Sequence, residues 1–183
     1  GVVTTLAGYT GSSGSSDGTG TSARFDFPRG ITTDGTNLYV ANTNTHTIRK
    51  IVIATGVVTT LAGYPNSSGN IDGTGTSARF DSPHGITTDG TNLYVVNHNK
   101  HTIRKVVIAT GAVTTLAGSS PGYTDGTGTS AKFTYPVGIT TDGTNLYVAD
   151  NDNHRIRKIV ISTGVVTTLA GSSVGFADGT GTA

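Results

Sequence analysis

The side chains with the clearest chemical potential are histidines that recur at a fixed spacing from a polar residue. The three pairs are Asn42 with His46, Asn97 with His101, and Asp150 with His154. An imidazole near an amide or carboxylate can act as a general base or hold a metal ion. A catalytic site has no reason to recur in every copy of a repeat, whereas a loop brace does. We therefore interpret these six residues as structural braces.

Residues that differ between otherwise similar copies are better candidates for ligand contacts, because the scaffold does not dictate them. The residue after a proline is Arg29, then His84, then Val137, and two positions earlier stand Phe27, Ser82 and Tyr135. In a later loop, Thr43 and Thr45 of the first copy become His98 and Lys100 in the second. The predicted ligand-binding set is Arg29, His84, His98, Lys100, Phe27 and Tyr135. Neutral drift at exposed positions is the alternative interpretation.

Two further polar motifs recur. Arg-Lys pairs at 49–50, 104–105 and 157–158 could bind phosphate in RNA, but the net charge of +1 and the seven tyrosines argue against it. We therefore expect their arginines to lie along neighbouring copies and bond carbonyl groups. DGTGT, beginning at Asp17, Asp72 and Asp125, resembles part of a calcium loop. It offers one carboxylate per copy, and calcium takes six to eight oxygens, so an Asx turn is the simpler interpretation. We predict no metal and no cofactor.

The composition narrows the class of protein. Charged residues make up 13% of the 183 residues, against about 25% in ordinary soluble domains. The net charge of +1 argues against a nucleic-acid partner, and no apolar run approaches the roughly 20 residues of a membrane span. The absence of cysteine excludes disulfides. Because Gly1 lies inside a repeat, we expect the chain to be a processed or excised piece.

The elements that position these residues form a repeat. GVVTTLAG begins at Gly1, Gly56 and Gly164, with GAVTTLAG at Gly111. The sequence GITTDGTNLYV occurs unchanged at 30–40, 85–95 and 138–148. Its β-branched residues favour strands, and Asp-Gly favours a hairpin turn between them. Each unit of about 50 residues is therefore one supersecondary element.

We predict four antiparallel strands per unit, which in the first unit are 31–33, 37–41, 47–54 and 57–62, with a short helical turn over 22–25. The last two carry apolar residues on both faces, which is typical of a sheet covered on both sides. The predicted fold is an all-β propeller with three four-stranded blades at 24–63, 79–118 and 132–171. Residues 1–8 would be a surplus outer strand completing a neighbouring blade, and 172–183 the start of the next connection.

The run from Pro136 to Ile159, PVGITTDGTNLYVADNDNHRIRKI, resembles the NHL repeat, with Asn153-His154 and Ile156 in place of leucine as its signature. The connections at 9–26, 64–81 and 119–134 are longer than usual for that family. The resemblance implies that one unit is one blade and that six blades are the common ring. Some family members bind RNA and others are lyases, so the resemblance alone leaves the activity open.

We expect a non-enzymatic binding or scaffold module, extracytoplasmic or secreted and of bacterial type, that presents its loops to a protein or glycan. The alternatives are a metal-assisted lyase or hydrolase using His84 and His98, and a designed or truncated propeller without a ligand. Three blades cannot close a ring, since propellers need about four to eight. We therefore predict a head-to-tail homodimer of six blades, with one terminal VTTLAG copy displaced.

Overall fold

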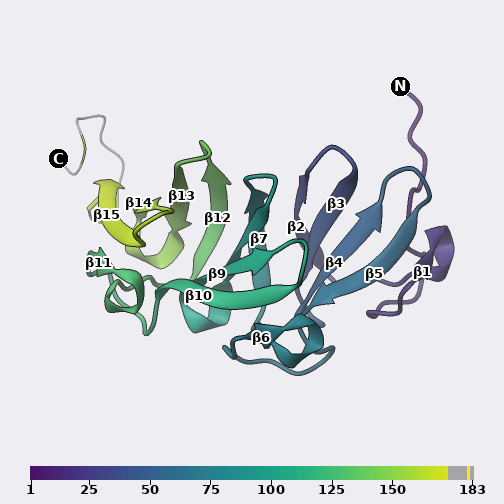
Figure 1. Cartoon of the computed structure of the whole chain (residues 1–183), viewed down its shortest axis with the longest axis horizontal. Helices are drawn as coiled ribbons and strands as arrows, with labels where there is room; N and C mark the ends of the chain where they lie inside the picture. The colour runs from purple at the N-terminus through teal and green to yellow at the C-terminus, as the bar shows by residue number, and fades with distance from the viewer. Residues whose placement is uncertain (173–180, 182–183) are drawn as a thin grey trace.

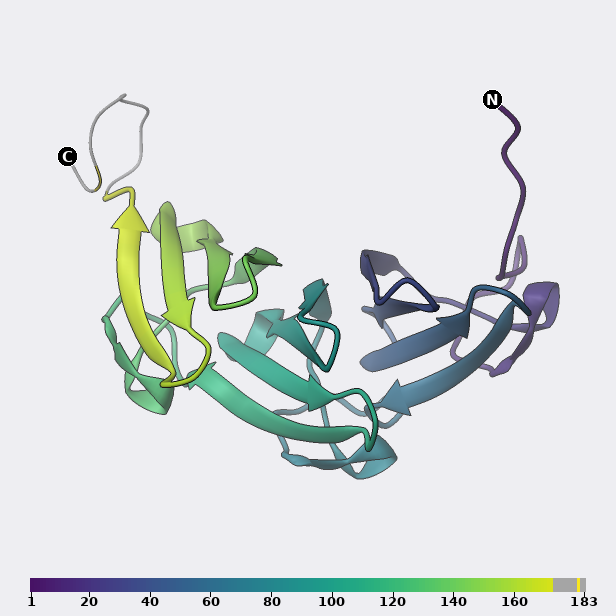
Figure 2. The same cartoon turned by 45° about the horizontal axis from the view of Figure 1, so that its top comes forward.

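The computed structural model describes residues 1–172 and 181, and it shows three antiparallel sheets arranged as an open arc (Figure 1, Figure 2). The first sheet contains β1 (Gly18–Thr19), β2 (Pro28–Thr33), β3 (Asn37–Asn42), β4 (Thr47–Val52) and β5 (Val57–Ala62). The second contains β6 (Gly73–Thr74), β7 (Pro83–Thr88), β8 (Asn92–Asn97), β9 (Thr102–Val107) and β10 (Ala112–Gly118). The third contains β11 (Gly126–Thr127), β12 (Pro136–Thr141), β13 (Asn145–Asp150), β14 (Arg155–Val160) and β15 (Val165–Ala170). The predicted three-bladed, all-β propeller architecture is confirmed.

Each blade has the same strand order, which in the first is β1-β5-β4-β3-β2. The two-residue strand at one edge was not predicted. It comes from the DGTGT motif, where Gly18 and Thr19 pair with Val58 and Val57. This strand lies before residue 24, so each blade includes part of the connection that precedes it.

Three predicted boundaries are wrong by a few residues. The first strand of the first unit begins at Pro28, which pairs with Asn42, and not at residue 31. The third strand of the first unit ends at Val52, because the amide of Gly56 donates to the carbonyl of Val52 at 2.8 Å and begins the turn there. The helical turn expected at 22–25 is a 3₁₀ turn at Gly20–Ser22, closed by the amide of Ala23 donating to the carbonyl of Gly20. Among the described residues, no helix is long and apolar enough to cross a membrane.

The invariant hairpin of each unit is organised by its aspartate. In the second unit the Asp89 carboxylate accepts the amides of Thr91 and Asn92, at 2.8 and 2.6 Å, and the hydroxyl of Tyr94 at 2.7 Å. Partial burial alone would raise the pKa of Asp89, but these hydrogen bonds outweigh it and lower that pKa to about 2. The turn, the second strand and a core tyrosine therefore depend on one carboxylate, which gives a physical reason for the strict motif.

A fully buried arginine fastens each blade to the connection that precedes it. The Arg104 guanidinium donates to the carbonyls of Arg79 and Ile71, at 2.9 and 3.1 Å, and to the Asp72 carboxylate at 2.7 Å. It lies 5.3 Å from the centre of the Phe80 ring. Arg49 and Arg157 form the same ion pair, with Asp17 and Asp125. The arginines were expected along neighbouring copies. Instead they are buried against their own connections, and the DGTGT aspartates are their partners.

Most of the core lies between the blades, and a smaller buried cluster lies on the first blade alone. Tyr39, Ala41 and Ile48 of the first blade form one buried cluster with Phe80 and Leu93 of the second unit. The corresponding residues of the second blade form an equivalent cluster with the third. The middle blade is therefore covered on both faces, as the apolar pattern of its strands predicts.

The predicted terminal elements have different outcomes. Residues 1–8 form no strand in the single chain, and Val2 and Val3 are almost fully exposed. Their predicted place in a neighbouring blade stays a prediction. Residues 173–180, 182 and 183 of the last predicted connection lie outside the described residues.

We predict that Arg104→Leu lowers the free energy of unfolding by at least about 2 kcal/mol, because buried carbonyl groups lose their donors. Urea unfolding followed by circular dichroism measures this change. The control Lys105→Leu alters the adjacent, partly exposed residue and should stay within about 0.5 kcal/mol of the wild type. Equal effects of the two substitutions would contradict the fastening role.

Candidate ligand-binding site

Several of the predicted ligand residues lie where the innermost strands begin. The strands β2, β7 and β12 lie next to one another, and each starts with proline. The following residues, Arg29, His84 and Val137, line one open hollow together with Gly30, Gly85 and Gly138. The residues after each proline therefore share one end of the blades.

His84 and His98 form the centre of this site. Their rings stack with centroids 4.0 Å apart and planes inclined by 14°. The His98 ring also lies 5.2 Å from the ring of Tyr135, on the third unit. Its Nδ1 is 2.9 Å from the carbonyl of Pro136, to which it donates as a protonated nitrogen. Two histidines of the second blade and a tyrosine of the third thus form one aromatic cluster across a blade junction.

The chemistry of His84 follows from its surroundings. Burial lowers its pKa to about 4, and the nearby charges of His98 and Arg29 act in the same direction. His84 is therefore a neutral imidazole at neutral pH, able to donate and to accept one hydrogen bond. Together with the exposed guanidinium of Arg29, the cluster offers stacking surface and hydrogen-bonding groups.

The other two predicted ligand residues, Lys100 and Phe27, lie outside the aromatic cluster that contains the histidine pair. The Lys100 ammonium lies 3.3 Å from the Asp81 carboxylate, so its charge is partly neutralised. Phe27 precedes Pro28 on the first blade and is 63% exposed, in the same left-handed conformation as Ser82 and Tyr135. The hydrogen bonds and ring contacts among the described residues do not join Phe27 or Lys100 to the histidine pair. The compact part of the predicted set is His84, His98, Tyr135 and Arg29.

The predicted brace residues do make structural contacts, although the two members of a pair have different partners. The Asn97 side chain accepts the amide of Asp81 at 2.6 Å and donates to Asn70 at 2.9 Å, and both belong to the preceding connection. His101 instead accepts the amide of Tyr135, in the next unit, at 3.1 Å. The histidines therefore join consecutive blades, which sequence reasoning missed because it considered only the loop that contains them.

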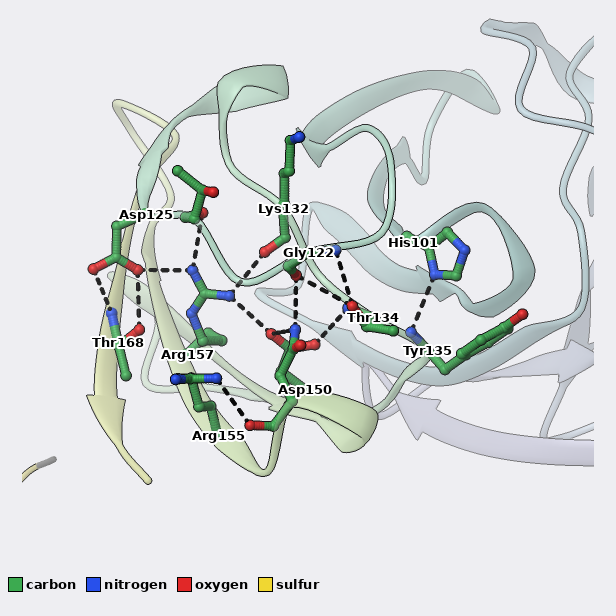
Figure 3. A network of polar contacts seen from close by, with 12 residues as sticks. His101, Gly122, Asp125, Lys132, Thr134, Tyr135, Asp150, Arg155, Arg157 and Thr168 are labelled. Carbon is green, nitrogen blue, oxygen red and sulfur yellow. Dashed lines mark hydrogen bonds and ion pairs between the residues drawn. The ribbon is translucent and has the colours of Figure 1, made fainter. Parts of the chain in front are cut away.

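The other two pairs show how the arrangement varies. Asn42 and His46 repeat it, with His46 accepting the amide of Ser82 at 3.1 Å. In the third blade Asp150 accepts the amide of Thr134 and forms a fully buried ion pair with Arg157 at 2.8 Å (Figure 3). The described residues provide no hydrogen-bond partner for the ring of His154. They also contain no group of three or more His, Asp or Glu side chains placed to hold a metal ion.

Comparison with known proteins agrees with this architecture. Residues 133–159 match the family model described as NHL repeat. The chain is 33% identical to NHL repeat-containing protein 2 of Homo sapiens over 144 residues, which is 72% of this chain and 20% of that protein. It is 28% identical to Protein SUPPRESSOR OF QUENCHING 1, chloroplastic, of Arabidopsis thaliana over 183 residues, or 93% of this chain and 17% of that protein. The chain thus spans about a fifth of the length of these relatives.

Solved structures of other proteins share the same fold. An auxiliary nutrient binding protein from Bacteroides thetaiotaomicron matches with a TM-score of 0.63 and 25% identity, covering 75% of this chain and 36% of that one. A protein of the same description from Bacteroides ovatus matches with a TM-score of 0.61 and 28% identity, covering 73% and 35%. A virginiamycin B lyase from Staphylococcus aureus, with 20% identity and a TM-score of 0.52 over 77% of this chain and 40% of that one, shares the fold alone.

We predict that the His84 imidazole titrates with a midpoint near pH 4, because burial and neighbouring positive charge oppose its protonation. Unfolded His84 would titrate near 6.5. The unfolded chain therefore binds this proton first, and the contribution of His84 to stability, fully present above pH 6.5, falls as the pH drops toward 4.

Histidine ring signals in a pH series of NMR spectra measure this midpoint. His98→Thr, which copies Thr43 of the first unit, removes the stacked ring and should raise the midpoint. A midpoint near 6.5 in the wild type would contradict the assigned environment.

Proposed function

The chain is an array of NHL repeats folded as β-propeller blades, and we propose that it is a non-enzymatic binding or scaffold module that forms a closed ring of six blades from two chains. One observation carries the binding proposal. Apart from their outer connections the units are closely similar, but they differ where their innermost strands begin, and there Arg29, His84, His98 and Tyr135 collect around one hollow or beside it. Because the scaffold residues are repeated, the unrepeated ones are free to serve a ligand.

The chemistry of the site supports a protein or glycan ligand. Exposed aromatic rings provide stacking surface, and imidazole and guanidinium groups bond hydroxyl and carbonyl oxygens. The similarity to structures described as auxiliary nutrient binding proteins supports a binding role. The low proportion of charged residues and the loops rich in Gly, Ser and Thr support an extracytoplasmic or secreted bacterial protein.

The alternative of a metal-assisted lyase or hydrolase has less support. Two rings stacked nearly in parallel at 4.0 Å direct their nitrogen lone pairs along their own planes, and so do not converge on one ion. The Nδ1 atom of His98 is also engaged by a backbone carbonyl. The geometry of the histidine pair thus favours a contact surface over a metal centre.

A glycan array and a peptide array probed with the labelled chain test the binding proposal. The variant His84→Val/Tyr135→Ser carries only residues that other units place at the same positions, namely Val137 and Ser82, so we expect it to fold. We expect the wild type to bind members of one array, and the double variant to bind them at least about tenfold more weakly.

The control Tyr64→Ala removes an exposed tyrosine on an outer connection and should bind as the wild type does. Absence of binding on both arrays would favour the alternative of a designed or truncated propeller without a ligand.

A further inference from the structure

The two end blades expose apolar faces that are buried between blades elsewhere in the chain. Ile156 on the outer face of the third blade is 41% exposed, whereas its equivalents Ile48 and Ile103 are fully buried. Ile31 on the outer face of the first blade is 60% exposed, against 6% for its equivalent Ile86. The faces lie at the two ends of the arc (Figure 2), and each contains a hollow lined largely by apolar residues.

The internal junctions define what each face accepts. At both of them, a tyrosine, two small apolar residues and an isoleucine of one blade pack against an alanine, a phenylalanine and aliphatic residues of the next. We call the first kind of surface the leading face and the second kind the trailing face. The third blade exposes a leading face: Tyr147, Ala149, Ile156 and Ala170. The trailing face of the first blade contains the exposed Ile31, the partly buried Phe25 and Leu38, and behind them Ala23, Val40 and Ile51, which are already buried within the single chain. The two open faces are therefore the two halves of a junction that the chain already forms twice.

Polar groups on the two faces are also complementary. His46 and His101 adopt positive φ angles of 61° and 56° and accept the amides of Ser82 and Tyr135, each at 3.1 Å. His154 has the same conformation, with φ of 54°. Phe27, the equivalent of Ser82 and Tyr135, also has their conformation, with φ of 49°. One open face thus presents the acceptor, and the other the donor, of the bond that crosses each internal junction.

The glycines of the innermost strands give an independent indication. A Cβ atom on Gly30 would collide with the carbonyl of His84, and one on Gly85 with the carbonyl of Val137. Gly138 occupies the same position in the third blade, but a Cβ atom there would only touch Ala149 at 3.6 Å. If another blade packed here as closely, Gly138 would need to lack a side chain for the same reason as Gly30 and Gly85. Its neighbour would then be the carbonyl of a second copy's Arg29.

We propose that the leading face of the third blade binds the trailing face of the first blade in a second copy of this chain, with His154 accepting the amide of the second copy's Phe27. The proposal rests on the six-bladed ring proposed above and specifies its junction. Two such contacts, related by a two-fold axis, close three blades plus three into one ring. Both contacts cover apolar surface that a soluble monomer would expose.

The junction also brings together two copies of one strand sequence. Ala7 packs on Ala23, Val40, Ile51 and Val58 of its own first blade. Ala62 packs in the same way on the second blade. When the second copy binds, its residues 2–7 would therefore point at the position that β15 occupies. Residues 2–7 and β15 have the identical sequence VVTTLA. One of the two copies must be displaced when the ring closes.

Sedimentation velocity over a range of micromolar concentrations tests the proposal. We expect the wild type to form a dimer of twice 18.5 kDa, and Ile156→Glu to weaken dimerisation at least about tenfold, because it places a charge in the junction. Ile156 is partly exposed in the single chain, so this variant should fold, as circular dichroism can verify. The control Ile71→Glu introduces the same charge on an outer connection, where Ile71 is 55% exposed, and should remain dimeric.

A second pair of variants tests the polar contact. His154→Ala should weaken the dimer without lowering the stability of the dissociated chain, whereas His101→Ala should lower the stability of the chain itself. A wild type that stays monomeric at all these concentrations would overturn the proposal. A dimer that Ile156→Glu leaves intact would also overturn it, since the copies would then associate through another surface. The arrays described above test the proposed ligand binding separately. The outcome of these dimerisation experiments therefore does not decide whether the chain binds a ligand.

Discussion

The structure depends on one constraint: a blade of this protein has two apolar faces and cannot cover either of them by itself. The two largest buried clusters lie between blades, and only a smaller one lies on a single blade, so each blade depends on its neighbours in a stack. Two of the three blades have one face without a neighbour. Because large exposed apolar surfaces are unusual in soluble monomers, the stack is expected to continue in both directions.

Within a blade, polar contacts set the geometry that the stack then uses. A hairpin aspartate fixes the first two strands, and a buried arginine fastens the third strand to the preceding connection. The histidine at the end of the second loop then reaches the next blade. Each of these residues recurs at the same place in every unit, which explains why so little of the sequence varies. Of the positions left to vary, 29, 84 and 137 line the hollow where the innermost strands begin, and His98 stacks on His84 beside it.

Much of the fold could be predicted from the sequence, because repetition and local turn chemistry are short-range signals. The Asp-Gly hairpin and the strand of residues 57–62 needed only β-branched residues and a turn motif. The roles of Arg104 and Asp72 could not be predicted, since they are 32 residues apart and meet only through the tertiary fold. The pairing of Gly18–Thr19 was missed because a two-residue strand has no periodic pattern.

The candidate site was predictable in part for the same reason. Comparison of the repeats identified His84, His98 and Tyr135 as unusual, but the stacking of two imidazoles across a loop depends on the conformation of residues 98–100. The spacing of Asn97 and His101 correctly drew attention to both residues, yet it could not reveal that one side chain contacts the preceding connection and the other the next blade.

Hydrogen exchange at the backbone amide of Phe27 tests most directly whether the stack continues through a second copy. The equivalent amides of Ser82 and Tyr135 are bonded to histidine within the chain, so they serve as internal references. If the blades continue into a second copy, the Phe27 amide should exchange as slowly as these two at high protein concentration and become faster on dilution. A Phe27 amide that exchanges freely at every concentration, while Ser82 and Tyr135 stay protected, would contradict this account.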